Sequence, residues 1–357
     1  MNTIGTDIRI TLWGSSHGSH IGCVLEGIGG GLDLDMERIT AEMSLRRPTS
    51  GIGTARREDD EVLIVSGVTE GVSNGDPISI MIANKDTRSK DYEQFRHRPR
   101  PGHADFTAVI RNPHHDIRGG GMFSGRMTAP LVAAGTVCRL ALEEEGVDVG
   151  GFTRSIGDVV DTQERGAKDC WNSRGFATRA CASDIDAGMF ETILEASSQG
   201  DSLGGVVECH VENLPIGVGE PWFDSLDGEL AKSMFSIPAM RAFEIGDGVL
   251  SSKARGSEMN DPFTISGNEV FTKTNHHGGI LGGRSSGMPL VFRCFFKPTP
   301  SISMDQSTVD LESMEDVSLR IEGRHDPCIV PRAVAVVEAM TSHCILDMMS
   351  RGGFIGN

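Results

Sequence analysis

Two segments in different halves of the chain share one pattern, in which a strand leads through a glycine-rich turn into an amphipathic helix. The first has its apolar strand at 21–25, glycines within 27–31, and a helix over 36–47 that ends before a proline. The second has its strand at 206–211 and its helix over 223–234. Because each unit has one apolar face to bury, the repeat predicts two pseudo-equivalent halves, each a sheet with a helix packed on it.

The other expected elements follow from the same apolar periodicities. Strands are predicted at 8–13, 62–65, 78–82 and 289–296, and helices from Thr128 to Glu145, over 190–196 and from Pro331 to Arg351. Residues 150–200 contain polar stretches and no motif, so we expect a peripheral insertion there. A chain of 357 residues can form one elaborate domain or two closely joined ones, and we predict a single domain over residues 1–357.

Charge and cysteine content limit the class of protein. The formal net charge of −17 argues against general binding to nucleic acid or to anionic membranes, because their phosphates would repel the chain. The eight cysteines form no CxxC pair and most lie in apolar runs, which indicates reduced core thiols rather than disulfides or a zinc site. The N-terminus lacks a basic and apolar leader, and no run approaches the roughly 20 apolar residues of a membrane span. We therefore expect a cytoplasmic protein.

Within this acidic chain, residues 96–126 form a basic stretch. They contain six arginines, four histidines, a triple glycine at 119–121 and only two carboxylates, Asp105 and Asp116. Arginines gathered around histidines indicate a site that holds a multiply charged anion and moves protons near it. A solvated basic loop is the alternative interpretation.

Other motifs admit more than one interpretation. Ser16-His17 follows a predicted strand and could begin a nucleophilic triad, but no GxSxG sequence accompanies it. The His-His pairs at 114–115 and 276–277 could ligate a metal, yet they lack HExxH or Cys/His spacing, so we predict no metal site. The glycine-rich segments match neither a dinucleotide-binding nor a P-loop pattern. Two Gly-Gly pairs within 278–283 would still let a flat or phosphorylated ligand lie against the backbone.

Several sequence blocks occur together in a fixed order along nearly the whole chain, with only about 150–200 left out. They are Gly14–Gly18, Arg46–Pro48, Arg98–Asp105, Arg118–Gly121 with Ser124, Gly219–Asp227, Phe243–Gly248, Asn275–Gly283, Lys297–Thr299 and Gly323–Cys328. In this order they resemble the chorismate synthase family. The resemblance implies an α+β fold, a β-α-β sandwich with helices packed between antiparallel sheets. It also implies a shikimate-pathway lyase that converts 5-enolpyruvylshikimate 3-phosphate to chorismate and phosphate by 1,4-anti elimination with reduced FMN.

The resemblance also assigns roles to individual residues. It implies that His17 protonates the leaving phosphate and that His103 protonates the reduced flavin near N1. Asp326, together with Ser16 and Ser124, would accept the flavin N5 proton. The substrate phosphate and carboxylates would be bound by Arg46, Arg47, Arg126 and Arg324. Flavin contacts would come from Met122, Phe123, Ser124, Pro238, Ala239, Gly282, Lys297, Pro298, Thr299, Pro300, Ser301 and Arg324.

The chain departs from the family pattern around the flavin. Met122, Phe123, Met127 and Pro238 stand where the family usually has other residues, and a basic residue expected near Gly51 is missing. These departures leave open a homologue that binds flavin or a phosphorylated metabolite without eliminating phosphate. An external flavin reductase is the expected source of reduced FMN, with NADPH acting only there. The family further implies a homotetramer.

Overall fold

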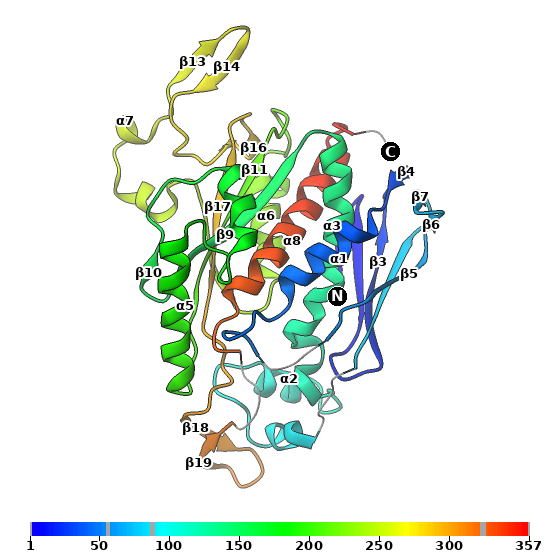
Figure 1. The fold of residues 1–357 in the computed structure, drawn as a ribbon, viewed down its shortest axis with the longest axis vertical. Helices are drawn as coiled ribbons and strands as arrows, with labels where there is room; N and C mark the ends of the chain where they lie inside the picture. Colours follow the sequence, from blue (N-terminus) through cyan, green and yellow to red (C-terminus); the bar gives the residue numbers. More distant parts are fainter. Residues whose placement is uncertain (1, 55–57, 86–89, 322–325, 356–357) are drawn as a thin grey trace.

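Two antiparallel sheets enclose a layer of helices in the computed structural model, which describes residues 2–54, 58–85, 90–321 and 326–355 (Figure 1). The first sheet consists, in spatial order, of β1 (Thr3–Ile4), β2 (Arg9–Gly14), β3 (His20–Glu26), β8 (Ile78–Ala83) and β5 (Val62–Ser66). The second consists of β10 (Val159–Val160), β9 (Asp148–Ile156), β11 (Gly205–Glu212), β17 (Leu290–Phe296) and β12 (Met240–Ile245). The predicted sandwich with helices between antiparallel sheets is confirmed.

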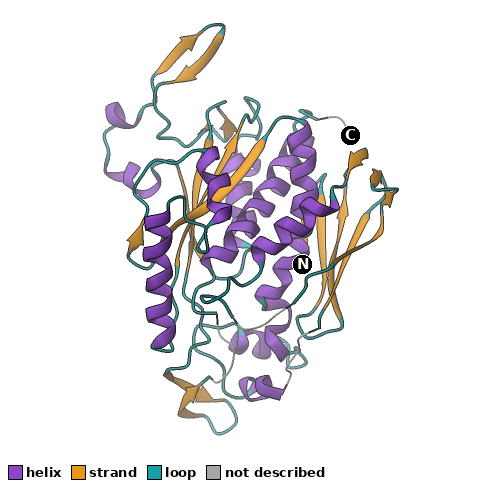
Figure 2. Cartoon of the chain, in the orientation of Figure 1, coloured by secondary structure: helices purple, strands orange, loops and turns teal. Residues whose placement is uncertain are grey.

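The helix layer is built from α1 (Met36–Arg46), α3 (Thr128–Glu144), α6 (Leu226–Phe235) and α8 (Val330–Arg351). Figure 2 shows these purple helices between the two orange sheets. α8 packs against the other three helices and against β9 and β11, and nearly all of its side chains are buried. It is long and apolar enough to cross a membrane by length and composition, but its apolar window is entirely buried inside the fold. α8 is therefore the central core helix.

The predicted repeat is visible in the topology. In chain order, β2, β3, α1, β5, β8 and α3 are followed by β9, β11, α6, β12, β17 and α8. The strand order β2-β3-β8-β5 of the first sheet corresponds to β9-β11-β17-β12 of the second. Each half thus has the same strand order and contributes two helices to the shared core, as the weak sequence repeat predicted.

Smaller elements lie around this sandwich. The short strands and hairpins are β4 (Gly30–Asp33), β6 (Val68–Thr69), β7 (Val72–Asn74), β13 (Phe263–Ser266), β14 (Glu269–Thr272), β15 (Ile280–Leu281), β16 (Arg284–Ser285), β18 (Asp305–Asp310) and β19 (Glu315–Arg320). The further α-helices are α2 (Asp105–Arg111), α4 (Ala167–Asn172), α5 (Ser183–Ser198) and α7 (Gly256–Met259). The 3-10 helices are η1 (Lys90–Arg96), η2 (Arg118–Phe123), η3 (Gly125–Met127), η4 (Ser173–Gly175), η5 (Trp222–Asp224) and η6 (Gly248–Lys253).

The expectation of an insertion over 150–200 is wrong at its start. β9 lies inside the second sheet and pairs with both β10 and β11. Its residues do not alternate in polarity because both of its faces are buried, one against α8 and the other against α4. A strand that is covered on both sides shows no alternation of polar and apolar residues, so the glycines and polar residues of β9 are typical of a loop when only the sequence is considered.

Two helices also begin at residues other than those predicted. α5 begins at Ser183 rather than 190, and α6 begins at Leu226 rather than 223. The Ser225 side chain caps α6 by accepting a hydrogen bond from the Gly228 N–H at 3.3 Å, which fixes that boundary. All eight cysteines are buried free thiols, as their apolar surroundings predicted.

Candidate active site

A cavity of about 350 Å³ is lined by residues from the end of α1, from η3 just before α3 and from the start of α8. These helix ends lie at the same end of the helix layer (Figure 1). The cavity is lined by five arginines, Arg46, Arg47, Arg100, Arg126 and Arg332. The predicted residues His103, Phe123, Ser124, Thr299, Pro300, Ser301 and Asp326 also line it. Helix ends and loops from both halves of the chain therefore meet at one concave, cation-rich site.

A buried carboxylate joins two of these arginines. One oxygen of Asp60 forms an ion pair with Nη2 of Arg46 at 2.6 Å, and the other forms an ion pair with Nη1 of Arg126. Burial acts to raise the pKa of Asp60, but the two guanidinium charges hold it below the ordinary value. Burial lowers the pKa of Arg46 to about 10, against the opposing charge of Asp60. Asp60 has a φ of 53°, so this carboxylate is held by a strained backbone.

The arginines differ in what they can still bind. Arg126 donates a hydrogen bond from Nε to Asn84 Oδ1 at 3.0 Å and one from Nη2 to the Ala83 carbonyl at 3.2 Å. These bonds add to its ion pair with Asp60. Arg46 and Arg47 each retain a buried Nε–H without a partner in the described part of the chain. An unpaired buried donor is costly, so these two arginines are the better suited to an added anion. The predicted contact of Arg126 with substrate stays a prediction.

His103 belongs to a second ion cluster. Its Nδ1 lies 2.6 Å from Asp105, whose two oxygens also accept hydrogen bonds from Arg100 at 2.7 and 2.8 Å. Burial opposes ionisation of Asp105, yet these hydrogen bonds hold its pKa well below the usual range. Burial lowers the pKa of His103, the hydrogen bond to Asp105 opposes that shift, and the charge of Arg100 adds to it. The carboxylate places a proton on Nδ1, and Nε2 lies 3.3 Å from Nη2 of Arg100.

His17 and His103 meet the same triple glycine. Gly119 and Gly120 have φ angles of 58° and 80°, in the left-handed region that favours glycine. A Cβ on Gly119 would lie 1.9 Å from Nδ1 of His17, and one on Gly120 would lie 3.6 Å from Nε2 of His103. Adjacent glycines thus bring together two histidines that are far apart in sequence.

The predicted proton relay of Ser16, Ser124 and Asp326 stays a prediction. The Ser16 hydroxyl is fully buried and donates to the Gly119 carbonyl at 3.0 Å, with His17 Nδ1 at 3.2 Å. Ser124 lines the cavity and accepts the Arg126 N–H as a helix cap. In the part of the chain that the structure describes, no hydrogen bond links Ser16, Ser124 and Asp326. Ser16 is better placed to orient His17.

Asp326 is a buried carboxylate at the cavity. Oδ2 forms an ion pair with Arg332 from the first turn of α8, and the Arg332 Nε donates to the Arg46 carbonyl at 2.9 Å. Burial raises the pKa of Asp326, although the Arg332 charge and a backbone hydrogen bond from Thr54 oppose the shift. A carboxylate with a raised pKa at a cavity is suited to accept a proton.

The predicted flavin-binding residues divide into groups. Thr299, Pro300, Ser301, Phe123 and Ser124 line the cavity, and Met122 lies exposed beside them. Lys297 Nζ would lie 3.9 Å from a Cβ on Gly102, and burial lowers its pKa.

Three others lie at or beyond the margin of the cavity. Pro238 lines a small adjoining cavity of about 90 Å³ that shares Arg46 and Arg332 with the main one. Ala239, with a φ of 71°, accepts the Lys297 N–H at 3.0 Å. Pro298 packs near Gly204 rather than lining either cavity.

The lining of this cavity does not include the predicted Gly282. Gly282 lies in the turn of the β15–β16 hairpin and is absent from the cavity lining of this chain. Arg324 lies outside the described residues. His276 and His277, which suggested a metal, instead pair with Asp247 and Asp261 at 2.8 Å each.

Three residues of this site stand in no recognised motif. Asp60 was hidden in an acidic run, and nothing in the sequence marks it as buried. Arg332 follows Pro331 at a helix start, and a basic residue in a first turn opposes the helix dipole; that mismatch was the available signal. Tyr92 meets the His17 ring edge-to-face at 5.1 Å and carries no motif.

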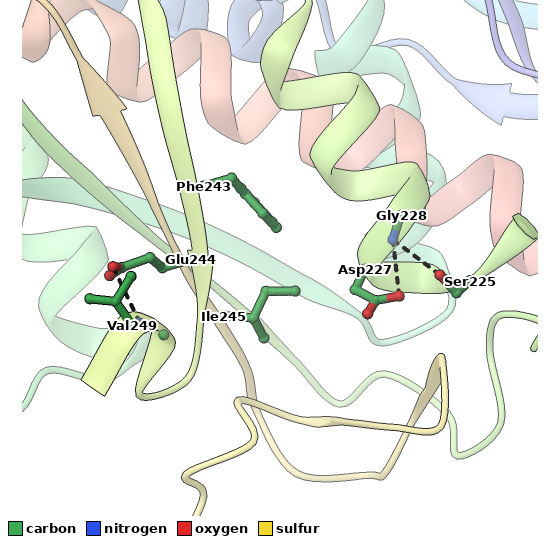
Figure 3. A pocket seen from close by; sticks show the side chains of 8 residues that line it. Ser225, Asp227, Gly228, Phe243, Glu244, Ile245 and Val249 are labelled. Atoms are coloured by element: carbon green, nitrogen blue, oxygen red, sulfur yellow. Dashed lines mark hydrogen bonds between the residues drawn. The ribbon is translucent and has the colours of Figure 1, made fainter. Parts of the chain in front are cut away.

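A second cavity of about 460 Å³ lies between the start of α6 and the edge strand β12 (Figure 3). Phe243 and Ile245 from β12 face Ser225 and Asp227 across it. None of the residues that line this cavity is cationic, and none was predicted to be functional. The arginine-lined cavity is therefore the candidate active site.

Comparisons with known proteins find one family. A family model described as chorismate synthase matches residues 8–350. A chorismate synthase from Dehalococcoides mccartyi is 46% identical over 99% of this chain and 98% of its own length. One from Methanosarcina barkeri is 43% identical over 99% of this chain and 97% of its own. A crystal structure of chorismate synthase superposes with a TM-score of 0.77 at 28% identity, covering 98% of this chain and 93% of that one.

Proposed function

The chain belongs to the chorismate synthase family of shikimate-pathway lyases, and on that premise we propose that it converts 5-enolpyruvylshikimate 3-phosphate to chorismate and phosphate. The reaction is a 1,4-anti elimination that requires reduced FMN without net oxidation or reduction. One observation carries the proposal: His17 and His103 lie against adjacent glycines, Gly119 and Gly120, beside a cavity with five arginines.

The arginines support binding of a multiply charged substrate. Phosphate expulsion develops negative charge, which fixed guanidinium groups stabilise best in a site that excludes water. Arg46 and Arg47 offer buried Nε–H groups for this purpose. Asp60 keeps the Arg46 and Arg126 side chains in fixed orientations before substrate arrives.

The residues around the cavity fit a reduced flavin. Tyr92, Phe95 and Phe123 line it and supply apolar surface for a planar ring, while the Asp326 carboxylate at the cavity could accept a hydrogen bond from an N–H group. Arg100 and His103 favour negative charge on the opposite edge. When bound, reduced FMN supplies a transient electron to the substrate.

Proton transfer falls to three side chains of the proposed site. His17 would donate to the leaving phosphate, because its ring lies against Gly119 and Tyr92, and both of these residues line the cavity. His103 would hold a proton opposite the electron-rich flavin, with Asp105 stabilising its charged form. Asp326 would accept a proton, because burial raises its pKa.

The proposal extends to assembly and supply. We propose a homotetramer in the cytoplasm that receives FMN already reduced by an external flavin reductase, where NADPH is consumed. Large exposed aromatic side chains, Trp222 at 84% and Phe223 at 94%, support self-association.

Anaerobic incubation with dithionite-reduced FMN and 5-enolpyruvylshikimate 3-phosphate tests the reaction. Release of phosphate with formation of chorismate is the expected result. If both ligands bind and no phosphate is released, the chain is a binding homologue without elimination activity. The substitutions near Met122 and Phe123 would then be the first to examine.

A further inference from the structure

The turn that carries His17 is held from outside by one amide side chain. Ser15 to Gly18 form a tight turn after β2, closed by the Gly18 N–H and the Ser15 carbonyl at 3.0 Å. Asn84 is the residue immediately after β8, and its Nδ2 donates to the Ser15 carbonyl at 3.1 Å and to the Gly18 carbonyl at 2.8 Å. Its backbone N–H also bonds the Ser19 carbonyl at 3.0 Å.

The other end of the same amide meets the arginine cluster. Asn84 Oδ1 accepts Nε of Arg126 at 3.0 Å. Arg126 in turn pairs with Asp60, which also pairs with Arg46. Because the amide oxygen faces a guanidinium and the amide nitrogen faces two carbonyls, Asn84 can adopt only one orientation. A continuous set of hydrogen bonds thus runs from the cluster to the turn.

The His17 ring is constrained on its other sides as well. Ser16 and the Gly119 backbone lie against Nδ1, and Tyr92 lies edge-on to the ring. Asp116 is close enough for the charge of His17 to lower the Asp116 pKa. None of these contacts holds the backbone of the turn, which is the part that Asn84 holds. Movement of the turn would therefore move the imidazole relative to the cavity.

We propose that Asn84 is a positioning residue that fixes the His17 imidazole relative to the Asp60–Arg126 ion pair. Asn84 is not among the residues that line the cavity, and it acts through the Ser15–Gly18 turn. The inference rests on the proposed function for its catalytic consequence, while the positioning itself can be measured without turnover. A misplacement of about 1 Å at a proton donor lowers rates about 100-fold.

Asn84→Asp distinguishes the role of the amide nitrogen, which donates to the turn, from that of the amide oxygen, which accepts from Arg126. The carboxylate keeps an acceptor for Arg126, but it sets an oxygen against the Ser15 and Gly18 carbonyls. We expect phosphate release to fall about 10- to 100-fold, with the substrate KM changed by no more than about threefold. Asn84→Ala removes both ends without adding charge and should lower turnover similarly. Asn74→Asp is the matched control, because Asn74 is exposed at the end of β7 and its side chain bonds Thr69 and the backbone N–H of Asp76.

The ring signals of His17 provide a readout that does not depend on activity. With histidine-labelled protein, they are assigned by their loss in His17→Gln. We expect them to shift in Asn84→Asp and Asn84→Ala while the His103 signals stay in place, and both sets to stay in place in Asn74→Asp. Unchanged His17 signals in both Asn84 variants would overturn the inference. If the wild-type protein releases no phosphate, the proposed function fails, whereas the ring signals still decide the role of Asn84.

Discussion

The protonation of His103 depends on one buried carboxylate. Burial lowers the His103 pKa, and Asp105 is the group that opposes this shift through a 2.6 Å contact with Nδ1. Removing the carboxylate charge must therefore lower the His103 pKa further. The proposed role of His103 requires the protonated ring, so activity is lost as pH rises through this pKa.

Asp105→Asn is expected to move the alkaline limb of the pH–rate profile to lower pH. Each unit by which the His103 pKa falls lowers the protonated fraction at neutral pH about tenfold. The profile of kcat against pH measures the limb directly. Asp310→Asn is the control, because Asp310 also pairs with an arginine, Arg98 at 2.8 Å, but lies on a surface hairpin. An alkaline limb at the wild-type position in Asp105→Asn would contradict the role given to His103.

Substitution of Gly119 tests whether the triple glycine positions His17. An alanine there has a Cβ that would lie 1.9 Å from His17 Nδ1 and 2.5 Å from Ser16 Oγ. We expect Gly119→Ala to lower phosphate release about 100-fold, because the ring must move away from its place. Gly146→Ala has a comparable positive φ of 75° and open space around the added Cβ. Near-wild-type turnover in Gly119→Ala, or an equal loss in Gly146→Ala, would show that contact with His17 is not the cause.

At the scale of single elements, the closest helix contact lies between α3 and α8. Gly135 in α3 faces Ala339 in α8, and a Cβ on Gly135 would lie 2.5 Å from both the Cβ and the carbonyl oxygen of Ala339. Only glycine allows the two backbones to approach this closely. The approach determines where α3 and α8 begin relative to each other, and those helix starts flank the cavity.

Gly135→Ala should lower the free energy of unfolding by about 1–3 kcal/mol, the usual cost of overpacking a core. Gly188, in the interior of α5, has only an ordinary 3.5 Å contact with Val159. Gly188→Ala should instead raise stability by about 0.5–1 kcal/mol, because alanine favours the helix. Denaturant titration followed by circular dichroism measures both changes. Equal effects of the two substitutions would exclude the close crossing as the cause.

The elements that sequence predicted well are those with one buried face. α1, β3 and β8 alternate or repeat as their burial requires, and their expected ranges agree with the structure within about two residues. β9 was misread because it is buried on both faces. The order of strands within the sheets also depends on contacts between distant segments, which periodicity does not contain.

The sequence predicts some residues of the candidate site and not others. His17, His103 and Asp326 stand in motifs. The structure places the two histidines against one glycine backbone, and His103 and Asp326 line the arginine-lined cavity. Asp60 and Arg332 could not be selected from sequence, because an acidic run and a helix start usually face solvent. Their importance comes from burial beside opposite charges, and burial is a property of the whole fold.

At the scale of the whole molecule, the two halves differ in what covers their outer sheet faces. In the second half, α4 covers the sheet, and Glu208 is buried there with Arg293 at 2.7 Å and His210 at 3.0 Å. In the first half, Leu63 and Val65 on β5 are 53% and 61% exposed. The two halves thus have similar sheets, and among the described residues α4 covers the outer face of the second sheet while Leu63 and Val65 of the first sheet are exposed.

Trp222 and Phe223 are the most exposed large apolar side chains and form the short 3-10 helix η5 before α6. Burying one such ring removes about 150–250 Å² from water, which at about 25 cal/mol per Å² stabilises an interface by roughly 4–6 kcal/mol at most. If the proposed homotetramer uses this surface, Trp222→Ser with Phe223→Ser should lower the assembly mass measured by light scattering, with circular dichroism unchanged. Leu194→Ser, at an exposed position of α5, is the control and should leave the mass unchanged. A tetramer that persists at low protein concentration in the double variant would exclude η5 from the interface. Assembly would then have to depend on other exposed surfaces, such as the outer face that carries Leu63 and Val65.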